Sequence, residues 1–542
     1  MEQQQTGSKA YLFSIVMVAV LGGLLFGYDT AVISGAEKGL QAFFKGAGDF
    51  EYTDVMHGFT SSSALIGCII GSSLSGLFAS RLGRKRSLIF AGVCFFLSAW
   101  GSMEPESYLL PQGHADWTLL VVFNFYRVLG GIGVGMASAI CPMYIGEIAP
   151  SNMRGMLVSC NQFAIIFGQL VVYFVNFIIM GSHANPIYDA AGAIANMVDA
   201  QWTIETGWRY MFGSEMVPAG LFTFLICFVP ETPRYLVMIG QDEKAYGVLA
   251  KINGSEKARE IIHDIRNTVT VKTEKLFSYG FMCIFVGVML SVFQQAVGIN
   301  AVLYYAPRIF QDMGMGNPMV QTVIMGIVNI SFTLVAVFTV EKLGRKPLLI
   351  FGSIGMAVGA LGVALTFGNE ALSTVTMLSI MVYSASFMFS WGPIAWVLIA
   401  ELFPNTIRGA AVAIAVAFQW IFNFIVSSTF VPMFNMHLTP GDDFGHWFTY
   451  GLYGAICIVA AFFVWKLVPE TKGKSLEATT CALEFTLLSP QVWNLPANGG
   501  RIMHAAGCHP PSKKRGWPNG QPLFFEELIP RGRQIRSRPP FR

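Results

Sequence analysis

RLGRK at residues 81–85 returns as KLGRK at residues 342–346, and it is one of three motifs that this chain contains twice. EIAPSNMRG (147–155) returns as ELFPNTIRG (401–409), and VPET (229–232) returns at residues 468–471. The three repeats keep the same order and lie 261, 254 and 239 residues apart. This pattern predicts two similar halves related by a parallel duplication, as in membrane proteins that are built of repeats.

The stretches between these motifs are long and apolar. Hydrophobic residues make up 54% of the chain, charged residues only 12%, and the mean hydropathy is +0.54. A water-soluble protein of 542 residues needs far more charged surface than this. Because about 20 apolar residues in a helix cross the ~30 Å hydrocarbon core of a bilayer, we predict an all-α membrane protein with about twelve spans: 11–34, 58–80, 87–103, 118–143, 156–180, 208–229, 277–302, 318–340, 348–368, 373–400, 408–432 and 448–467.

A polar segment divides these spans into two sets of six. Residues 230–276 carry interleaved acids and bases, which is typical of short helices at the membrane surface. We therefore predict an N-terminal half (1–229), a cytoplasmic linker (230–276) and a C-terminal half (277–477). Residues 478–542 contain proline and glycine clusters without periodicity, which predicts a disordered or non-native tail.

Lys and Arg residues indicate how the chain is oriented in the membrane. They gather in the hairpins at 81–86 and 342–346 and in the polar linker, whereas the connections 104–117 and 181–207 contain none. Because cytoplasmic loops carry the excess of positive charge, we expect the basic side, and with it both termini, to be cytoplasmic.

Several further motifs are specific enough to indicate a family. They are GRK (83–85), PETPR (230–234), QQAVGIN (294–300), GPIAW (392–396) and PETKGK (469–474). With them the chain resembles the sugar-porter branch of the major facilitator superfamily over residues 9–477. GGLLFGYDT (22–30) and NQFAIIFGQ (161–169) are most similar to the stretches found in its bacterial D-xylose/proton symporters. The resemblance implies the major facilitator fold, and proton-coupled import of a monosaccharide, D-xylose first, across a bacterial inner membrane by alternating access.

Two charged residues stand inside apolar spans of the first half. Asp29 lies in the first span and Arg127 in the fourth, where an unpaired charge costs several kcal/mol, so we expect the two to pair. Burial disfavours the charged carboxylate and the arginine favours it, so a conformational change that alters either effect changes its affinity for a proton. The resemblance implies proton coupling at Asp29, because facilitators of the glucose type carry an amide at this position. The alternative is a purely structural ion pair.

Amide and aromatic side chains are the candidates for sugar binding. Amides offer both donors and acceptors to vicinal hydroxyls, and an indole offers a flat wall with one donor. The predicted binding residues are Gln162, Gln169, Gln294, Gln295, Asn300, Trp396, Gln419 and Phe26, with Tyr304 and Trp391 as further wall residues. Polar residues in membrane helices also serve to bond neighbouring helices, and Asn124, Asn176 and Asn423 are candidates for that role alone.

The repeated cytoplasmic motifs place charges at the same spacing in both halves. Glu and Arg stand seven residues apart at a helix end, with a proline between them, in each copy. The resemblance implies that six residues form inter-helix salt bridges that hold the cytoplasmic side shut: Arg84, Glu147, Arg154, Arg345, Glu401 and Arg408. The alternative is ordinary positive-inside anchoring.

Other classes of function find little support in the sequence. A uniporter of the same fold is the nearest alternative, and a membrane sugar receptor is a more distant one. We expect no enzyme, cofactor, metal site or nucleic-acid partner, and one chain contains a complete pathway, so it should function as a monomer. The glycine run 130–135 continues an apolar helix with no strand before it, so it predicts close helix packing rather than a dinucleotide-binding loop. His504, Cys508 and His509 have no fourth ligand that would complete a metal site.

Overall fold

The computed structural model describes most of the chain up to Lys472. The described residues are 7–46, 51–106, 115–150, 153–181, 187–188, 194–195, 202–269, 276–278, 280–313, 317–403, 407–438 and 444–472. They all belong to one compact unit, residues 1–494, while residues 495–542 form a second unit outside the described part. The predicted tail, 478–542, therefore lies outside the described residues.

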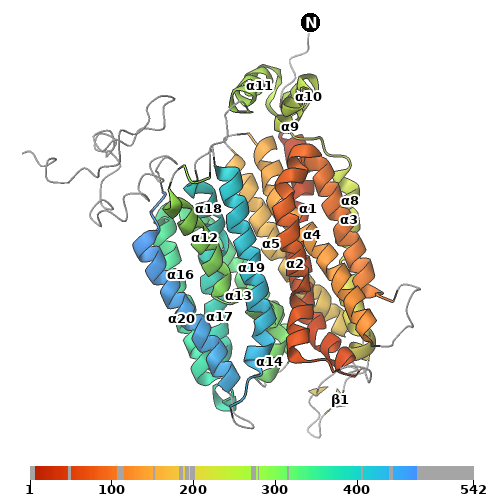
Figure 1. Ribbon diagram of the computed structural model, residues 1–542, viewed down its shortest axis with the longest axis vertical. Coiled ribbons are helices and arrows are strands. Elements are labelled where there is room, and N and C mark those ends of the chain that lie inside the picture. Colours follow the sequence, from red (N-terminus) through yellow and green to blue (C-terminus); the bar gives the residue numbers. More distant parts are fainter. Residues whose placement is uncertain are drawn as a thin grey trace, which may run out of the picture. The chain divides into compact units, whose positions relative to one another are not determined.

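The first half is a set of long helices with one interrupted member (Figure 1). Its helices are α1 (Lys9–Lys45), α2 (Asp54–Arg81), α3 (Arg84–Met103), α4 (Trp117–Ile148), α5 (Arg154–Gly181), α7 (Trp208–Gly213, preceded by the π-helical turn η1, Thr203–Gly207) and α8 (Met216–Ile226). Before η1, the two-residue strands β1 (Ile187–Tyr188) and β2 (Ile194–Ala195) pair antiparallel, with Ile187 opposite Ala195.

The second half repeats this plan with more interruptions. Its helices are α12 (Phe281–Ala296), α13 (Ile299–Tyr304), α14 (Ala306–Asp312), α15 (Pro318–Leu343), α16 (Arg345–Thr366), α17 (Ser373–Phe389, preceded by the 3-10 turn η2, Glu370–Leu372), α18 (Trp391–Leu402), α19 (Arg408–Phe434) and α20 (Phe444–Leu467). Gly298, with φ +90°, separates α12 from α13. A left-handed backbone suits glycine because it has no Cβ, and this break stands two residues before Asn300.

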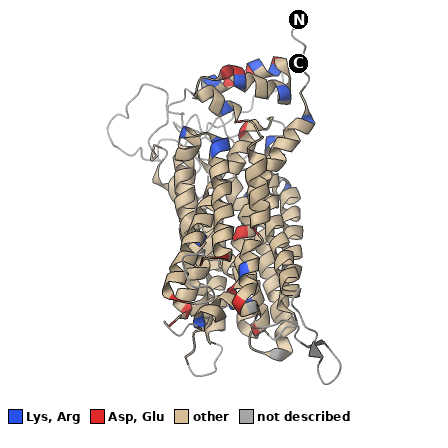
Figure 2. Ribbon diagram, turned by 90° about the vertical axis from the view of Figure 1, so that its right-hand side faces the viewer, with Lys and Arg blue, Asp and Glu red and all other residues tan. Residues whose placement is uncertain are grey.

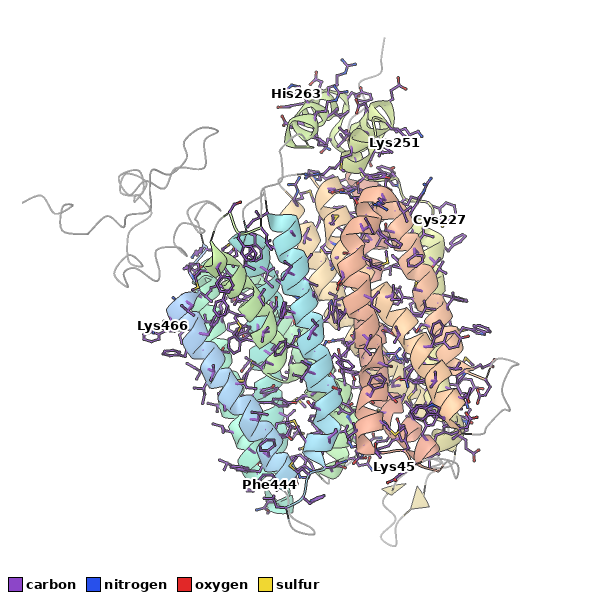
Figure 3. All side chains as sticks on the ribbon, in the orientation of Figure 1. Lys45, Cys227, Lys251, His263, Phe444 and Lys466 are labelled. Atoms are coloured by element: carbon purple, nitrogen blue, oxygen red, sulfur yellow. The ribbon has the colours of Figure 1, made fainter. Side chains whose placement is uncertain are left out.

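Three short helices connect the halves: α9 (Pro233–Met238), α10 (Asp242–Asn253) and α11 (Ser255–Val269). They lie at one end of the long helices, the end where Cys227 and Lys251 are labelled in Figure 3, while Lys45 and Phe444 lie at the opposite end. The expected short helices in the linker are thus present.

Eleven helical stretches in the described part are long and apolar enough to cross a membrane, with Phe281–Tyr304 (α12 and α13) and Ser373–Ile399 (α17 and part of α18) each counted as one. The predicted sixth span, 208–229, is present as α7 and α8, which are separated at Ser214 and Glu215, so neither piece is long enough by itself. In Figure 2 most of the charged residues lie near the ends of the helices, while a few red and blue segments lie farther along them. The all-α prediction is confirmed, apart from the short β1–β2 pair.

The first helix is longer than the sequence predicts. The predicted span ends at residue 34, but α1 continues to Lys45 and has 37 residues, or about 55 Å at ~1.5 Å per residue. Its last turns contain Glu37, which is 1% exposed and paired within the structure. Hydropathy ends the span before Glu37 and Lys38 because it does not show that a charge has a partner.

The two halves meet along long helices. In the first half α4 packs on α2 and α3, and α5 packs on α1, whereas α2 contacts α19 and α5 contacts α15 across the halves. The predicted close packing of the glycine run is confirmed, because a Cβ at Gly131 would overlap the carbonyl oxygen of Ala64 on α2. This packing brings the first and fourth predicted spans close enough for Asp29 and Arg127 to meet.

Candidate functional site

Asp29 and Arg127 form an ion pair in the interior of the first half. Arg127 Nη1 on α4 lies 2.7 Å from Asp29 Oδ1 on α1, and the two residues are 2% and 0% exposed. The guanidinium also stacks over the ring of Phe212, with 4.9 Å to its centroid. The pairing that the sequence predicts is therefore present. The energetic cost of burying each charge is offset by the other.

A second acid, Glu215, lies near this pair and is not among the site residues predicted from the sequence. Glu215 stands where α7 ends and α8 begins, is 0% exposed, and interacts electrostatically with both Asp29 and Arg127. Apart from the contact between these two carboxyl groups, the oxygens of Glu215 and Asp29 Oδ2 have no hydrogen-bond partner. The adjacent Ser214 bonds Tyr28 OH at 2.7 Å, which fixes the break next to α1. The sequence does contain a signal, since Glu215 is the only acid in the predicted span 208–229.

Asp29, Arg127 and Glu215 form an unbalanced cluster of charges. Two carboxylates interact electrostatically with one guanidinium, and all three residues are at most 2% exposed, so one negative charge is without compensation unless a proton binds. An uncompensated buried charge is costly. Chemically, the cluster is suited to hold one proton and to exchange it when its surroundings change.

The predicted binding residues come from helices that are packed against one another. Helix α12 contacts both α18 and α19, and α13 contacts both α1 and α19. The rings of Phe26 on α1 and Trp420 on α19 lie 5.5 Å apart across the two halves. The buried members of the predicted set are Gln169, Gln294, Gln295 and Gln419, and the half-buried ones are Gln162, Asn300, Trp396 and Phe26.

Several buried polar atoms in this region have no hydrogen-bond partner. Gln294 donates from Nε2 to the carbonyl oxygens of Trp391 and Gly392 at 3.0 and 3.2 Å, but its Oε1 is unpaired. Unpaired atoms in the same helices include Gln169 Oε1, Asn161 Oδ1, Gln419 Oε1 and Trp420 Nε1. Buried polar groups in native proteins are nearly always bonded, so these unpaired amide oxygens are acceptors to which a hydroxyl group can donate.

The side-chain N–H groups of the other candidates donate hydrogen bonds within the protein. Asn124 donates to Leu120 O at 2.9 Å, Asn176 to Val32 O at 3.3 Å and Asn423 to Tyr304 OH at 3.4 Å. Trp391 is fully buried and donates to Ser353 Oγ at 2.7 Å. These contacts favour a role in helix packing for Asn423 and for Trp391, which the sequence predicts as a wall residue. Oδ1 of Asn124 and Oδ1 of Asn176 are buried without a partner, so these two residues are only partly bonded.

Four of the six predicted gate residues pair within their own halves. Arg84 Nη2 lies 2.7 Å from Glu147 Oε1, and Arg345 Nη2 lies 3.0 Å from Glu401 Oε1. Arg154, the first residue of α5, is exposed. The side chain of Arg408 lies outside the described residues.

The repeated PET motifs contact the repeated basic loops. Glu231 accepts backbone N–H bonds from Arg84 and Lys85, and Glu470 accepts them from Arg345 and Lys346, at 2.9–3.1 Å for the shortest bonds. Each acid therefore caps the N-terminus of a helix, α3 or α16, where its charge is favourable. Burial raises the pKa of Glu231 above its ordinary value, although these N–H bonds oppose the shift. Both motifs are evident in the sequence, but the contact between them is not.

The repeats and the helix arrangement have counterparts in known proteins. A model of the family described as "Sugar (and other) transporter" matches residues 15–482 of this chain. The chain belongs to the sugar transporter family. Within the sugar transporter family, the D-xylose-proton symporter of Escherichia coli (strain K12) is 46% identical over 483 residues, which are 87% of this chain and 95% of that protein.

Other members of the sugar transporter family extend the comparison. The glucose facilitated diffusion protein of Zymomonas mobilis is 35% identical over 478 residues, covering 87% of this chain and 97% of that protein. The solved structure of the xylose transporter XylE from E. coli, in a partially occluded inward-open conformation, matches with a TM-score of 0.75 at 44% identity and covers 86% of this chain and 100% of that chain. The predicted major facilitator fold is confirmed, and the protein is a multi-pass membrane transporter rather than an enzyme.

Proposed function

We propose that this protein imports D-xylose together with protons by alternating access. The observation that carries the coupling is the buried cluster in which Asp29 and Glu215 face the single guanidinium of Arg127. The choice of sugar is supported by the relative that is 46% identical, which is named a D-xylose-proton symporter.

The cluster couples the two substrates through its charge. When the site faces outward, Asp29 takes up a proton and balances the cluster, and sugar binds among the amides of α5, α12, α13 and α19. The two halves then rock, and sugar and proton leave on the cytoplasmic side. The proton gradient biases this cycle because the two orientations differ in their affinity for the proton. The pairs Arg84–Glu147 and Arg345–Glu401 belong to the cytoplasmic gate.

The arrangement in the membrane is part of the same proposal. The basic hairpins and α9–α11 lie on the cytoplasmic side of a bacterial inner membrane, with both termini inside. Residues 1–229 and 277–477 are the two halves, joined by the linker 230–276, and one chain works as a monomer.

The alternative is facilitated diffusion, the activity named for the relative from Z. mobilis. In that case the Asp29–Arg127 pair is structural. Proteoliposomes with a pH dye outside distinguish the two functions when D-xylose is added and then a panel of hexoses. External alkalinisation with D-xylose is the expected result. Flux of labelled D-xylose without a change of pH would support facilitated diffusion, and a response to a hexose alone would correct the substrate.

Gln169 provides a test of the sugar site. Its Oε1 is buried without a partner, so replacing Gln169 by Leu removes one hydrogen bond to the sugar and leaves the helix contacts in place. We expect the half-saturation concentration for D-xylose to rise about threefold to tenfold, measured by exchange of labelled sugar. Asn124→Leu is the matched control, since Asn124 lies on α4, which carries none of the proposed binding residues, and it should leave the half-saturation concentration unchanged. Equal effects of both variants would remove Gln169 from the site.

A further inference from the structure

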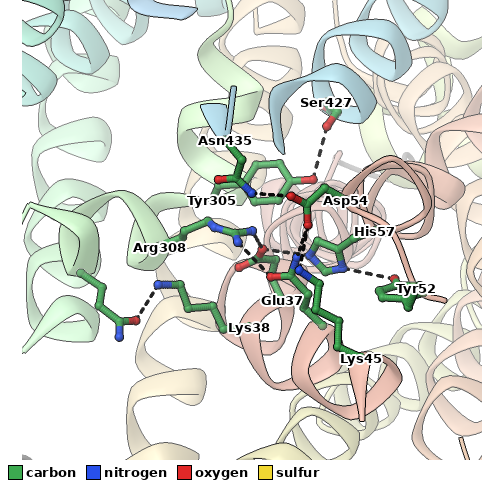
Figure 4. Close-up of polar contacts among 12 residues, drawn as sticks. Glu37, Lys38, Lys45, Tyr52, Asp54, His57, Tyr305, Arg308, Ser427 and Asn435 are labelled. Atoms are coloured by element: carbon green, nitrogen blue, oxygen red, sulfur yellow. Dashed lines mark hydrogen bonds and ion pairs between the residues drawn. The ribbon is translucent and has the colours of Figure 1, made fainter. Parts of the chain in front are cut away.

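A second buried group of charges lies near the end of α1, separate from the Asp29 cluster. It joins Glu37 on α1, His57 on α2 and Arg308 on α14, which are 1%, 0% and 9% exposed (Figure 4). This is the end of α2 opposite to the basic hairpin that begins at Arg81, and so the outer end in the proposed orientation. None of these three residues belongs to the site described above.

The three residues meet at one carboxylate oxygen. Arg308 Nη1 pairs with Glu37 Oε1, and His57 Nε2 lies 2.9 Å from the same oxygen. Arg308 Nη2 donates to Gln41 Oε1 at 2.8 Å, one turn farther along α1. His57 Nδ1 in turn faces Tyr52 OH at 3.2 Å, so the ring is held from both sides. The arginine is thereby fixed by two side chains of α1, and the glutamate by two partners.

This group crosses between the two halves of the protein. Glu37, Gln41 and His57 belong to the first half, whereas Arg308 belongs to the second. Arg308 lies on α14, which follows α13 and its predicted binding residue Asn300 in one chain segment. A movement of α13 and α14 away from α1 therefore has to separate Arg308 from Glu37.

Two further contacts flank the buried group and cross the same boundary, and both are more open to water than the buried group is. Lys38 Nζ lies 3.2 Å from Asp312 Oδ1, and both side chains are about one-third exposed, at 35% and 34%. Asn435, at the end of α19, donates to Asp54 Oδ2 at 2.8 Å. Water screens such exposed contacts, so they hold the halves together less strongly than a buried pair does.

We propose that the Glu37–Arg308 pair, positioned by His57 and Gln41, is the outer gate of this transporter. The inference rests on the proposed alternating-access function. The pair closes the external entrance while the site faces the cytoplasm, and it separates when the site faces outward. His57 stays with Glu37 on opening, because both belong to the first half, so the carboxylate keeps a partner. The strength of the pair sets how often the entrance opens.

The test is a distance measurement between spin labels at the outer end, one at Glu51 in the first half and one at Leu438 in the second, both exposed in the structure. Full-length protein in lipid nanodiscs is measured without sugar. Replacing Arg308 by Met removes the pair, and we expect the ratio of the longer to the shorter distance to rise about tenfold. Glu37→Gln should shift the ratio in the same direction, and it provides a second variant if Arg308→Met does not fold.

Two further variants make the result specific. Arg308→Lys keeps the charge but loses the second nitrogen, Nη2, with which Arg308 bonds Gln41. It should therefore shift the ratio less than Arg308→Met does. Lys38→Met removes the exposed pair at the same end and should change the ratio by less than about twofold. An unchanged ratio in both Arg308→Met and Glu37→Gln would overturn the gate. The distance measurement needs neither sugar nor a proton gradient, so it tests the gate independently of the symport assays.

Discussion

Proteoliposomes that contain the Asp29→Asn variant should equilibrate labelled D-xylose but not accumulate it. An amide at position 29 does not take up a proton, and the cluster then contains one acid and one base, Glu215 and Arg127, which balance each other without a proton. For one proton per sugar, a gradient of one pH unit is worth about 1.4 kcal/mol, or a sugar ratio of about ten. We expect this ratio in the native protein and a ratio of about one in the variant.

Exchange of labelled sugar across the membrane provides the control for folding. Exchange needs sugar binding and the movement of the two halves but no net proton transfer, so Asp29→Asn should retain it. Accumulation against a gradient by a variant that also exchanges sugar would refute the coupling role of Asp29 and leave the pair with Arg127 as a structural feature.

Replacing Glu215 by Gln should uncouple the protein in the same way. The substitution keeps the size of the side chain and removes the second acid, so Asp29 and Arg127 form a neutral pair with no excess charge for a proton to balance. We expect the number of protons taken up per sugar, measured with a pH dye and labelled D-xylose, to fall from about one toward zero. The energetic reason is that a buried ion pair resists protonation of its acid as long as its base remains in contact.

The matched control replaces an acid outside the membrane. Glu243 lies exposed on α10, and Glu243→Gln should leave the protons taken up per sugar unchanged. A Glu215→Gln variant that still takes up about one proton per sugar would show that Asp29 and Arg127 couple the substrates without the second acid.

Much of this site could be predicted from residues that stand out in their spans. Asp29 and Arg127 are expected to pair because neither charge can be left alone in an apolar helix, and the structure contains that pair. The amides are recognised because their chemistry differs from that of their surroundings. Their unpaired oxygens could not be foreseen, because a sequence does not show which amides find a partner inside the protein.

The residues that were missed depend on contacts between distant segments. Glu215 interrupts the sixth span at a helix break, and its importance follows only from its place beside Asp29. Glu37, His57 and Arg308 come from three helices, and Glu37 and Arg308 are 271 positions apart in the chain. Hydropathy ends the first span before Glu37, because it scores every charge as solvated. A partner on another helix offsets the cost of burying Glu37, and for this residue only the fold shows which partners it has.

Accumulation of labelled D-xylose under an imposed pH gradient tests proton-coupled import most directly. Proteoliposomes with the native protein are loaded at neutral pH and diluted into a buffer one pH unit more acidic, with and without an uncoupler. We predict accumulation to about ten times the external concentration, which collapses when the uncoupler is added. Equilibration to the external concentration, identical with and without the gradient, would contradict proton coupling and leave a facilitator of the same family.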